Sequence, residues 1–140
     1  MKRLIYVPMA IVALAPFFGC SSVDVDIPEA KYSNEAVWTG RTLQNVRYYN
    51  TTVEAVAKAA VAAARAQGLF YTGDDPDNRG GTVLYFRGDL DVKVTIDVCL
   101  TAPSKKDPNA QQYVEVAIVY GNWGDLGKSQ KLVSGITQNL

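Results

Sequence analysis

Alternating apolar and polar residues mark two strands in the C-terminal half of the chain. Between residues 91 and 100 every second side chain from Val92 onward is apolar, and residues 112–120 alternate in the same way from Val114. A period of two residues is typical of a strand with one buried and one solvated face. Such strands belong to antiparallel sheets that are covered on one side only. We therefore predict a half-covered antiparallel sheet.

A helical period predicts two helices. Residues 52–67 carry apolar side chains at spacings of three and four. Thr51 and Glu54 are in capping-box spacing at the start of this segment, and Gly68 follows its end. The far side of this helix is rich in alanine, so we expect it to be partly covered as well. A second helix is predicted to begin near Asp125. Its apolar stripe consists of Leu132, Val133, Ile136 and Leu140.

The remaining segments complete an α+β fold. Residues 36–49 are extended in character, and two shorter strands are predicted between Phe70 and Arg87, around the turn sequence DDPDNRGG. The predicted order is strand, helix, four strands, helix. We expect an antiparallel β-meander of about four to five strands with two helices packed on one face, formed by a single domain over residues 34–140.

The N-terminal segment has the pattern of a processed targeting sequence. Lys2 and Arg3 precede an uncharged stretch over residues 4–18, which ends at Gly19 and Cys20. The stretch is short for a membrane span and contains two prolines. The segment resembles a bacterial lipoprotein signal, in which a small residue precedes a cysteine that is acylated. An ordinary secretory signal cut elsewhere is the alternative.

The resemblance implies a signal peptide over residues 1–19 and an acylated Cys20. Residues 20–33 are then the anchor and a polar tether, since they carry no sustained apolar period. Ser21 after the cysteine implies sorting to the outer membrane, with the domain facing the periplasm. Two or more acyl chains anchor a protein stably. We therefore expect a lipid-anchored protein of the cell envelope.

Charge and composition exclude several function classes. The chain has 14 Lys+Arg against 14 Asp+Glu, so it lacks the basic excess of a nucleic-acid-binding protein. It has no histidine, which removes the commonest general base and the commonest metal ligand. We therefore predict no catalytic residue, no cofactor and no metal site.

Two features could indicate a functional site, an acidic segment and a cysteine. Asp74, Asp75 and Asp77 could start a calcium loop, but the EF-hand spacing then places Arg79 and Phe86 at ligand positions. We predict a solvated turn instead. Cys99 is the one thiol left once Cys20 is acylated, and the sequence leaves open whether it is free or forms an intermolecular disulfide.

A candidate partner surface lies on the predicted solvated face of the sheet. If the helices cover the valine-rich face, the opposite face presents Lys93 and Tyr113 among mixed charges. Trp123 lies between Gly121 and Gly124, in a turn that can hold its ring outward as an aromatic contact. Aromatic residues with polar neighbours are favoured in protein interfaces. We therefore name Lys93, Tyr113 and Trp123 as the candidate partner surface.

The domain as a whole resembles a family of small uncharacterised bacterial lipoproteins, a domain of unknown function. The resemblance rests on the signal, the alanine-rich helix, the meander ending at residues 119–121, and Gly124-Asp125 followed by Ser129. It implies no catalytic residues. We expect a non-enzymatic protein that acts by binding or structural association with an envelope protein. A small-ligand carrier that uses the sheet face, or an enzyme accessory acting on envelope material, is the alternative.

Overall fold

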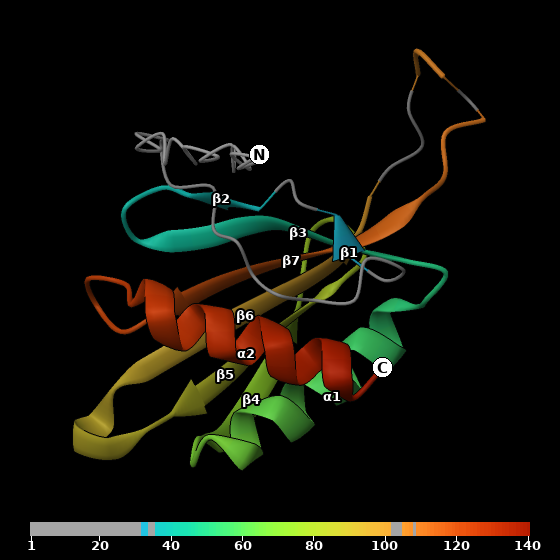
Figure 1. The fold of residues 1–140 in the computed structure, drawn as a ribbon. Helices are drawn as coiled ribbons and strands as arrows, with labels where there is room; N and C mark the ends of the chain where they lie inside the picture. The colour runs from blue at the N-terminus through green and yellow to red at the C-terminus, as the bar shows by residue number, and fades with distance from the viewer. Residues whose placement is uncertain (1–31, 34–35, 102–104, 108) are drawn as a thin grey trace, which may run out of the picture.

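The computed structural model describes residues 32–33, 36–101, 105–107 and 109–140. The predicted signal peptide, Cys20 and most of the predicted tether lie outside the described residues. The described chain forms an open antiparallel sheet with two helices on one side of it (Figure 1). In that part of the chain we find no helix with the length and apolar character that crossing a bilayer requires.

The elements follow the predicted order, with additional short strands near the start. The strands are β1 (Tyr32–Ser33), β2 (Val37–Trp38), β3 (Thr42–Tyr49), β4 (Phe70–Pro76), β5 (Thr82–Arg87), β6 (Lys93–Leu100) and β7 (Tyr113–Tyr120). The helices are α1 (Val53–Ala66) and α2 (Leu126–Gln138), and a short 3-10 turn, η1 (Asp89–Asp91), precedes β6.

The sheet is wider than predicted. Its order is β1-β3-β7-β6-β5-β4, with β2 also paired to β3, which makes seven strands rather than four to five. β1 and β2 pair with opposite ends of β3, so they share one edge of the sheet. The segment 36–49, predicted as one extended stretch, is a hairpin instead, because Thr39 and Thr42 close a turn around Gly40. β4 to β7 form the predicted meander.

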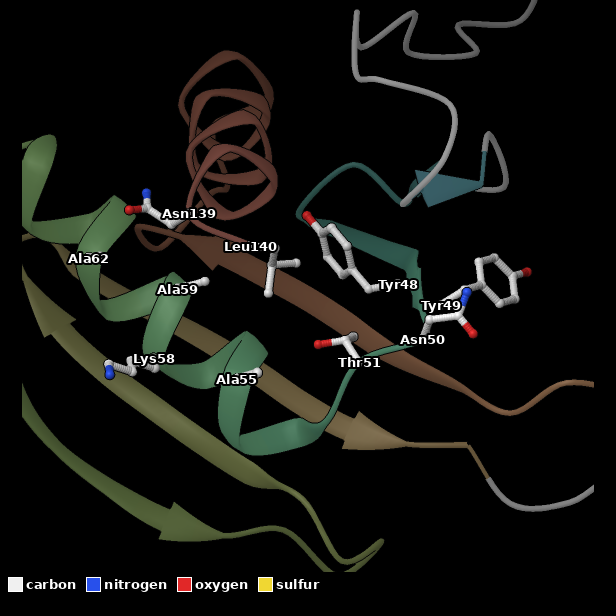
Figure 2. Close-up of a pocket in the computed structure, with 10 residues that line it drawn as sticks. All are labelled: Tyr48, Tyr49, Asn50, Thr51, Ala55, Lys58, Ala59, Ala62, Asn139 and Leu140. Carbon is white, nitrogen blue, oxygen red and sulfur yellow. The ribbon is translucent and has the colours of Figure 1, made fainter.

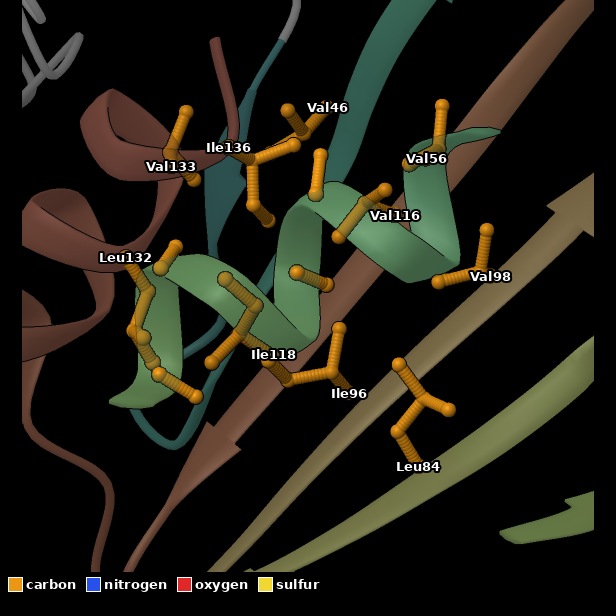
Figure 3. Close-up of a cluster of buried hydrophobic side chains, with 14 of the residues drawn as sticks. Val46, Val56, Leu84, Ile96, Val98, Val116, Ile118, Leu132, Val133 and Ile136 are labelled. Carbon is orange, nitrogen blue, oxygen red and sulfur yellow. The ribbon is translucent and has the colours of Figure 1, made fainter. Parts of the chain in front are cut away.

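Both helices cover the valine-rich face of the sheet. Strands β3, β5, β6 and β7 send alternate side chains toward α1 and α2, and these side chains are buried. Figure 3 shows the resulting core between the helices and the sheet. Its fully buried members, with no exposed surface, include Leu43, Val46, Val56, Ile96, Val98, Val116, Ile118, Leu132, Val133 and Ile136.

The helix ends confirm most of the local predictions. Asp125 caps α2 by accepting a hydrogen bond from the Lys128 amide at 3.0 Å. Gly68, with φ +77°, ends α1 as predicted. The predicted capping box at Thr51 is wrong, because Thr52 is the N-cap and its hydroxyl accepts from the Ala55 amide at 3.1 Å. The register thus shifts by one residue, and Glu54 is not in a capping-box position.

Close approach of the two helices explains why α1 is buried on two sides. Besides the residues that face the sheet, Ala59 and Ala63 are buried, as expected for the alanine-rich far side. Gly135 of α2 packs directly against Ala63, since a Cβ built on Gly135 would lie 2.7 Å from the Ala63 Cβ. Small residues on both helices therefore let the backbones approach each other closely.

Candidate functional site

The three residues of the candidate partner surface lie in two different places. Lys93 starts β6 and Tyr113 starts β7, and these neighbouring strands are antiparallel. The two side chains are therefore at opposite ends of the sheet, about 24 Å apart for an eight-residue strand. Trp123 lies at the Lys93 end, where the Gly121 amide donates to the Lys93 carbonyl at 2.7 Å. One continuous surface through all three residues is thus ruled out, and two separate surfaces remain.

The first surface surrounds Tyr113 on the face of the sheet that carries no helix. The Arg47 guanidinium lies over the Tyr113 ring, 4.5 Å from its centroid. Tyr49 meets the same ring edge-on, with the centroids 5.7 Å apart. Arg47 and Glu115 are directly opposite in the β3–β7 register. We call Arg47, Tyr49, Tyr113 and Glu115 the tyrosine cluster, whose side chains are all half-buried.

The tip of the β4–β5 hairpin covers the neighbouring part of this face. The Arg79 guanidinium donates to Asp77 at 3.1 Å and to Asp97 of β6 at 2.9 Å. The backbone at Gly81 packs so closely on Val98 and Cys99 that no side chain fits there. The hairpin tip therefore folds back over β6 and covers Cys99.

Cys99 is consequently a buried, free thiol among the described residues, with 3% of its surface exposed. Burial raises the pKa of the thiol to about 11; the nearby Arg79 opposes this shift and the carboxylates of Asp97, Glu115 and Asp77 add to it. A protonated, covered thiol is a poor nucleophile and a poor partner for another chain. The geometry thus favours the free thiol over the intermolecular disulfide.

Asp77, Asp97 and Cys99 place one ligand atom each within 4.8 Å of one another. A metal ion would need a deprotonated thiol, whereas the pKa of Cys99 is raised. It would also compete with Arg79, whose guanidinium already neutralises both carboxylates. The residues present therefore fit a structural ion-pair cluster better than a metal site.

The acidic segment before this cluster is exposed to solvent, as the sequence predicted, but it is a strand and not a turn. Asp74 and Asp75 belong to β4, which continues to Pro76, and they pair with Leu84 and Val83 of β5. Their side chains point to opposite faces of the sheet, because neighbours along a strand alternate. The turn itself begins only at Asp77, and its acidic residues do not converge on one point.

The second surface is at the other end of the sheet, where three connections meet. Trp123, in the turn between β7 and α2, is 88% exposed, and Leu90, in the turn between β5 and β6, is 98% exposed. Gly124 packs against the backbone of Arg41 from the β2–β3 turn. In Figure 1 these turns lie at the left end of the sheet. We call Leu90 and Trp123 the exposed pair.

A cavity of about 540 Å³ lies on the helix side, between α1, the end of β3 and the end of α2. Figure 2 shows Ala55, Ala59 and Leu140 facing the Tyr48 ring across it, while the Lys58 side chain runs along the outside of α1. The Tyr48 hydroxyl is directed elsewhere, since it contacts the Val133 carbonyl at 3.3 Å. The wall of the cavity combines apolar groups of α1, Leu140 and the Tyr48 ring with the polar residues Asn50, Thr51, Lys58 and Asn139. The cavity is not on the sheet face where the carrier hypothesis placed it.

Comparison with protein-family models and with curated proteins gives no match to this chain. The resemblance to a lipoprotein family therefore stays a prediction. Sequence reasoning missed Arg47, Arg79 and Leu90. The position of each of these residues depends on a turn or a bulge, which the alternation of apolar and polar residues does not locate. For Leu90 there was a signal, since the sequence Asp89–Asp91 before a strand indicates a tight turn.

Proposed function

We propose that this protein is a lipid-anchored, non-enzymatic component of the cell envelope that binds a protein partner through the tyrosine cluster. The observation that carries the proposal is the packing of Arg47 over the Tyr113 ring and of Tyr49 edge-on against it, on a sheet face that no described helix covers. Tyrosine and arginine dominate the energetic centres of protein interfaces. Rings held by their neighbours lose little conformational entropy on binding.

The anchor is part of the proposal and rests on the sequence of residues 1–20. An acylated Cys20 sorted to the outer membrane would present the domain to the periplasm on a tether of 13 residues, 21–33. Intact-mass analysis of the mature protein is expected to show an N-terminal cysteine with acyl mass. Cys20→Ser is expected to abolish that mass. An unmodified N-terminus at another residue would refute the anchor.

The partner surface is tested by site-specific cross-linking in cells. A photoreactive residue at Tyr113 is expected to give an adduct with one envelope protein, identified by mass spectrometry and then purified for affinity measurement. Glu115→Gln removes a charge from the cluster without placing a second cation opposite Arg47, and it should weaken that affinity severalfold with little change in the melting temperature. The matched control is Glu54→Gln, which removes an exposed carboxylate on α1. Equal loss in both variants would remove the tyrosine cluster as the binding surface.

The cavity between α1 and β3 supports a second candidate, a carrier of small apolar ligands. Its volume of about 540 Å³ is within the usual range of ligand pockets. A fluorescent apolar dye is expected to bind there, and Ala55→Leu should displace the dye by filling the cavity. Dye binding that is unchanged in Ala55→Leu would reject the carrier.

A further inference from the structure

The exposed pair stands apart from the other surface side chains. Leu90 and Trp123 have the largest exposed fractions among the large apolar residues described, 98% and 88%. Their turns touch, because the Gly121 amide bonds the Lys93 carbonyl and Val92 lies against Gly121. Leu90 is two residues before Val92, and Trp123 is two residues after Gly121. Two large apolar side chains thus project from one end of the sheet.

Both side chains are held outward by turns with a defined backbone. Leu90 and Asp91 have φ values of +57° and +60°, in the left-handed region that glycine or asparagine normally occupies. Trp123 lies between Gly121 and Gly124, and Gly124 is wedged against the backbone of Arg41. A leucine kept in a costly conformation while fully exposed points to a role outside the fold.

The end of the sheet around the exposed pair is basic, although the chain as a whole is neutral. The Asp91 carboxylate is paired with Arg87 at 2.9 Å, and Asp125 is engaged in capping α2. Lys128 packs over the Tyr120 ring, 5.3 Å from its centroid. Among the described residues, the exposed cations of this end are Arg41, Lys93, Lys128 and Lys131, which outnumber its two exposed acids, Asp89 and Asp91.

We propose that this end of the sheet docks on an anionic phospholipid surface, with Leu90 and Trp123 entering the interface and the cations Arg41, Lys93 and Lys128 facing the headgroups. The pair is carried on protruding turns, as an insertion into a bilayer interface requires. Tryptophan favours that interface because its ring is apolar and its N–H polar. Each nearby cation adds attraction to anionic lipid.

The docking rests on the proposed function in one respect, since the anchor on Cys20 holds the domain near a membrane. β1 joins the sheet where Tyr32 pairs with Tyr48, at the end opposite the exposed pair. That end is about 24 Å away along the eight residues of β3. The eleven residues between Cys20 and Tyr32 let these two residues lie at most about 40 Å apart. The tether therefore allows the far end to reach the anchoring membrane, and anchoring makes a weak contact effective.

The test uses protein purified from cell membranes and reconstituted into vesicles of phosphatidylcholine with phosphatidylglycerol. Some of the lipid carries bromine, which quenches tryptophan at the interface. The chain has two tryptophans, so Trp123→Phe reports the contribution of Trp38 alone. We expect strong quenching in the wild type and little in Trp123→Phe. Vesicles of phosphatidylcholine alone should quench less.

Leu90→Asn removes the apolar tip and suits the left-handed backbone, and it should lower the docking equilibrium about tenfold. Leu100→Asn is the matched control, because Leu100 is exposed at the opposite end of β6. Wild-type quenching no stronger than that of Trp123→Phe overturns the proposal. Quenching that is the same without phosphatidylglycerol, or the same in Leu90→Asn, also overturns it. Self-association that Leu90→Asn abolishes would assign the pair to a second copy, and would overturn it too.

Failure of the anchor is separable from failure of the docking. The intact mass of the same sample reports acylation of Cys20. Acylated protein without tryptophan quenching refutes the docking and leaves the proposed function standing. Unacylated protein whose Trp123 is quenched refutes the anchor and supports the docking.

Discussion

Replacing Gly135 by alanine tests how closely the two helices pack. Alanine inside a helix is ordinarily more stable than glycine by about 0.5–1 kcal/mol. At Gly135 the new methyl group would lie 2.7 Å from the Ala63 Cβ. Carbon atoms pack at about 3.5–4.0 Å, so the helices must separate by about 1 Å. Helix propensity therefore predicts that Gly135→Ala stabilises the protein, whereas the packing predicts that it destabilises the protein.

The packing effect should dominate. Overfilling a close-packed site typically costs about 1–3 kcal/mol, and neither Ala63 nor the helix backbone can turn aside. After the helix gain is deducted, Gly135→Ala is expected to destabilise the protein by about 1–2 kcal/mol. In a domain of this size that lowers the melting temperature by roughly 4–16 °C. Thermal unfolding followed by circular dichroism measures the change.

Gly127 offers a control on the same helix. A Cβ there would meet only the Asp125 Oδ1, at 3.7 Å, so Gly127→Ala should stabilise by up to about 0.5–1 kcal/mol. Ala63→Gly in the Gly135→Ala background should relieve the clash and give a clear coupling energy in a double-mutant cycle. If Gly135→Ala stabilised the protein as Gly127→Ala does, the close packing of α1 on α2 would be refuted.

Three further outcomes follow from particular residues. With its pKa raised to about 11, the Cys99 thiol should resist a thiol reagent at pH 8 until the protein is unfolded; rapid labelling of folded protein would contradict its burial. The Cys99 thiol loses its proton near pH 9 in the unfolded chain and near pH 11 in the folded protein, so the unfolding free energy should fall between about pH 9 and 11. The fall should be less steep in Cys99→Ala, and identical slopes of unfolding free energy against pH would argue against the raised pKa. Leu90→Asn should raise the unfolding free energy by about 1 kcal/mol, whereas an unchanged denaturation midpoint would mean an unstrained turn.

Local periodicity determined the main elements of this protein. The strands β6 and β7, the helices α1 and α2, and the cap at Asp125 were all predictable, because each depends on residues within a few positions of one another. The mixed α+β class followed from their order. The short strands β1 and β2 could not be predicted, since two-residue strands exist only through pairing with β3.

The surfaces were predictable only in part. Alternation correctly placed Lys93 and Tyr113 on the face away from the helices. It said nothing of their separation, because antiparallel pairing of β6 with β7 sends their first residues to opposite ends. The stacking of Arg47 on Tyr113 likewise joins residues far apart in sequence.

The sequence by itself determined which residues alternate in β6 and β7, which side of these two strands is apolar, and where the two helices lie to within about a residue. Tertiary structure alone decided which residues from distant segments are in contact. It folded the β4–β5 hairpin tip over Cys99, brought Gly135 against Ala63, and gathered Leu90 and Trp123 at one end of the sheet. The physical reason is that local patterns reflect short-range backbone preferences, whereas these contacts depend on register, bulges and turn geometry between distant segments.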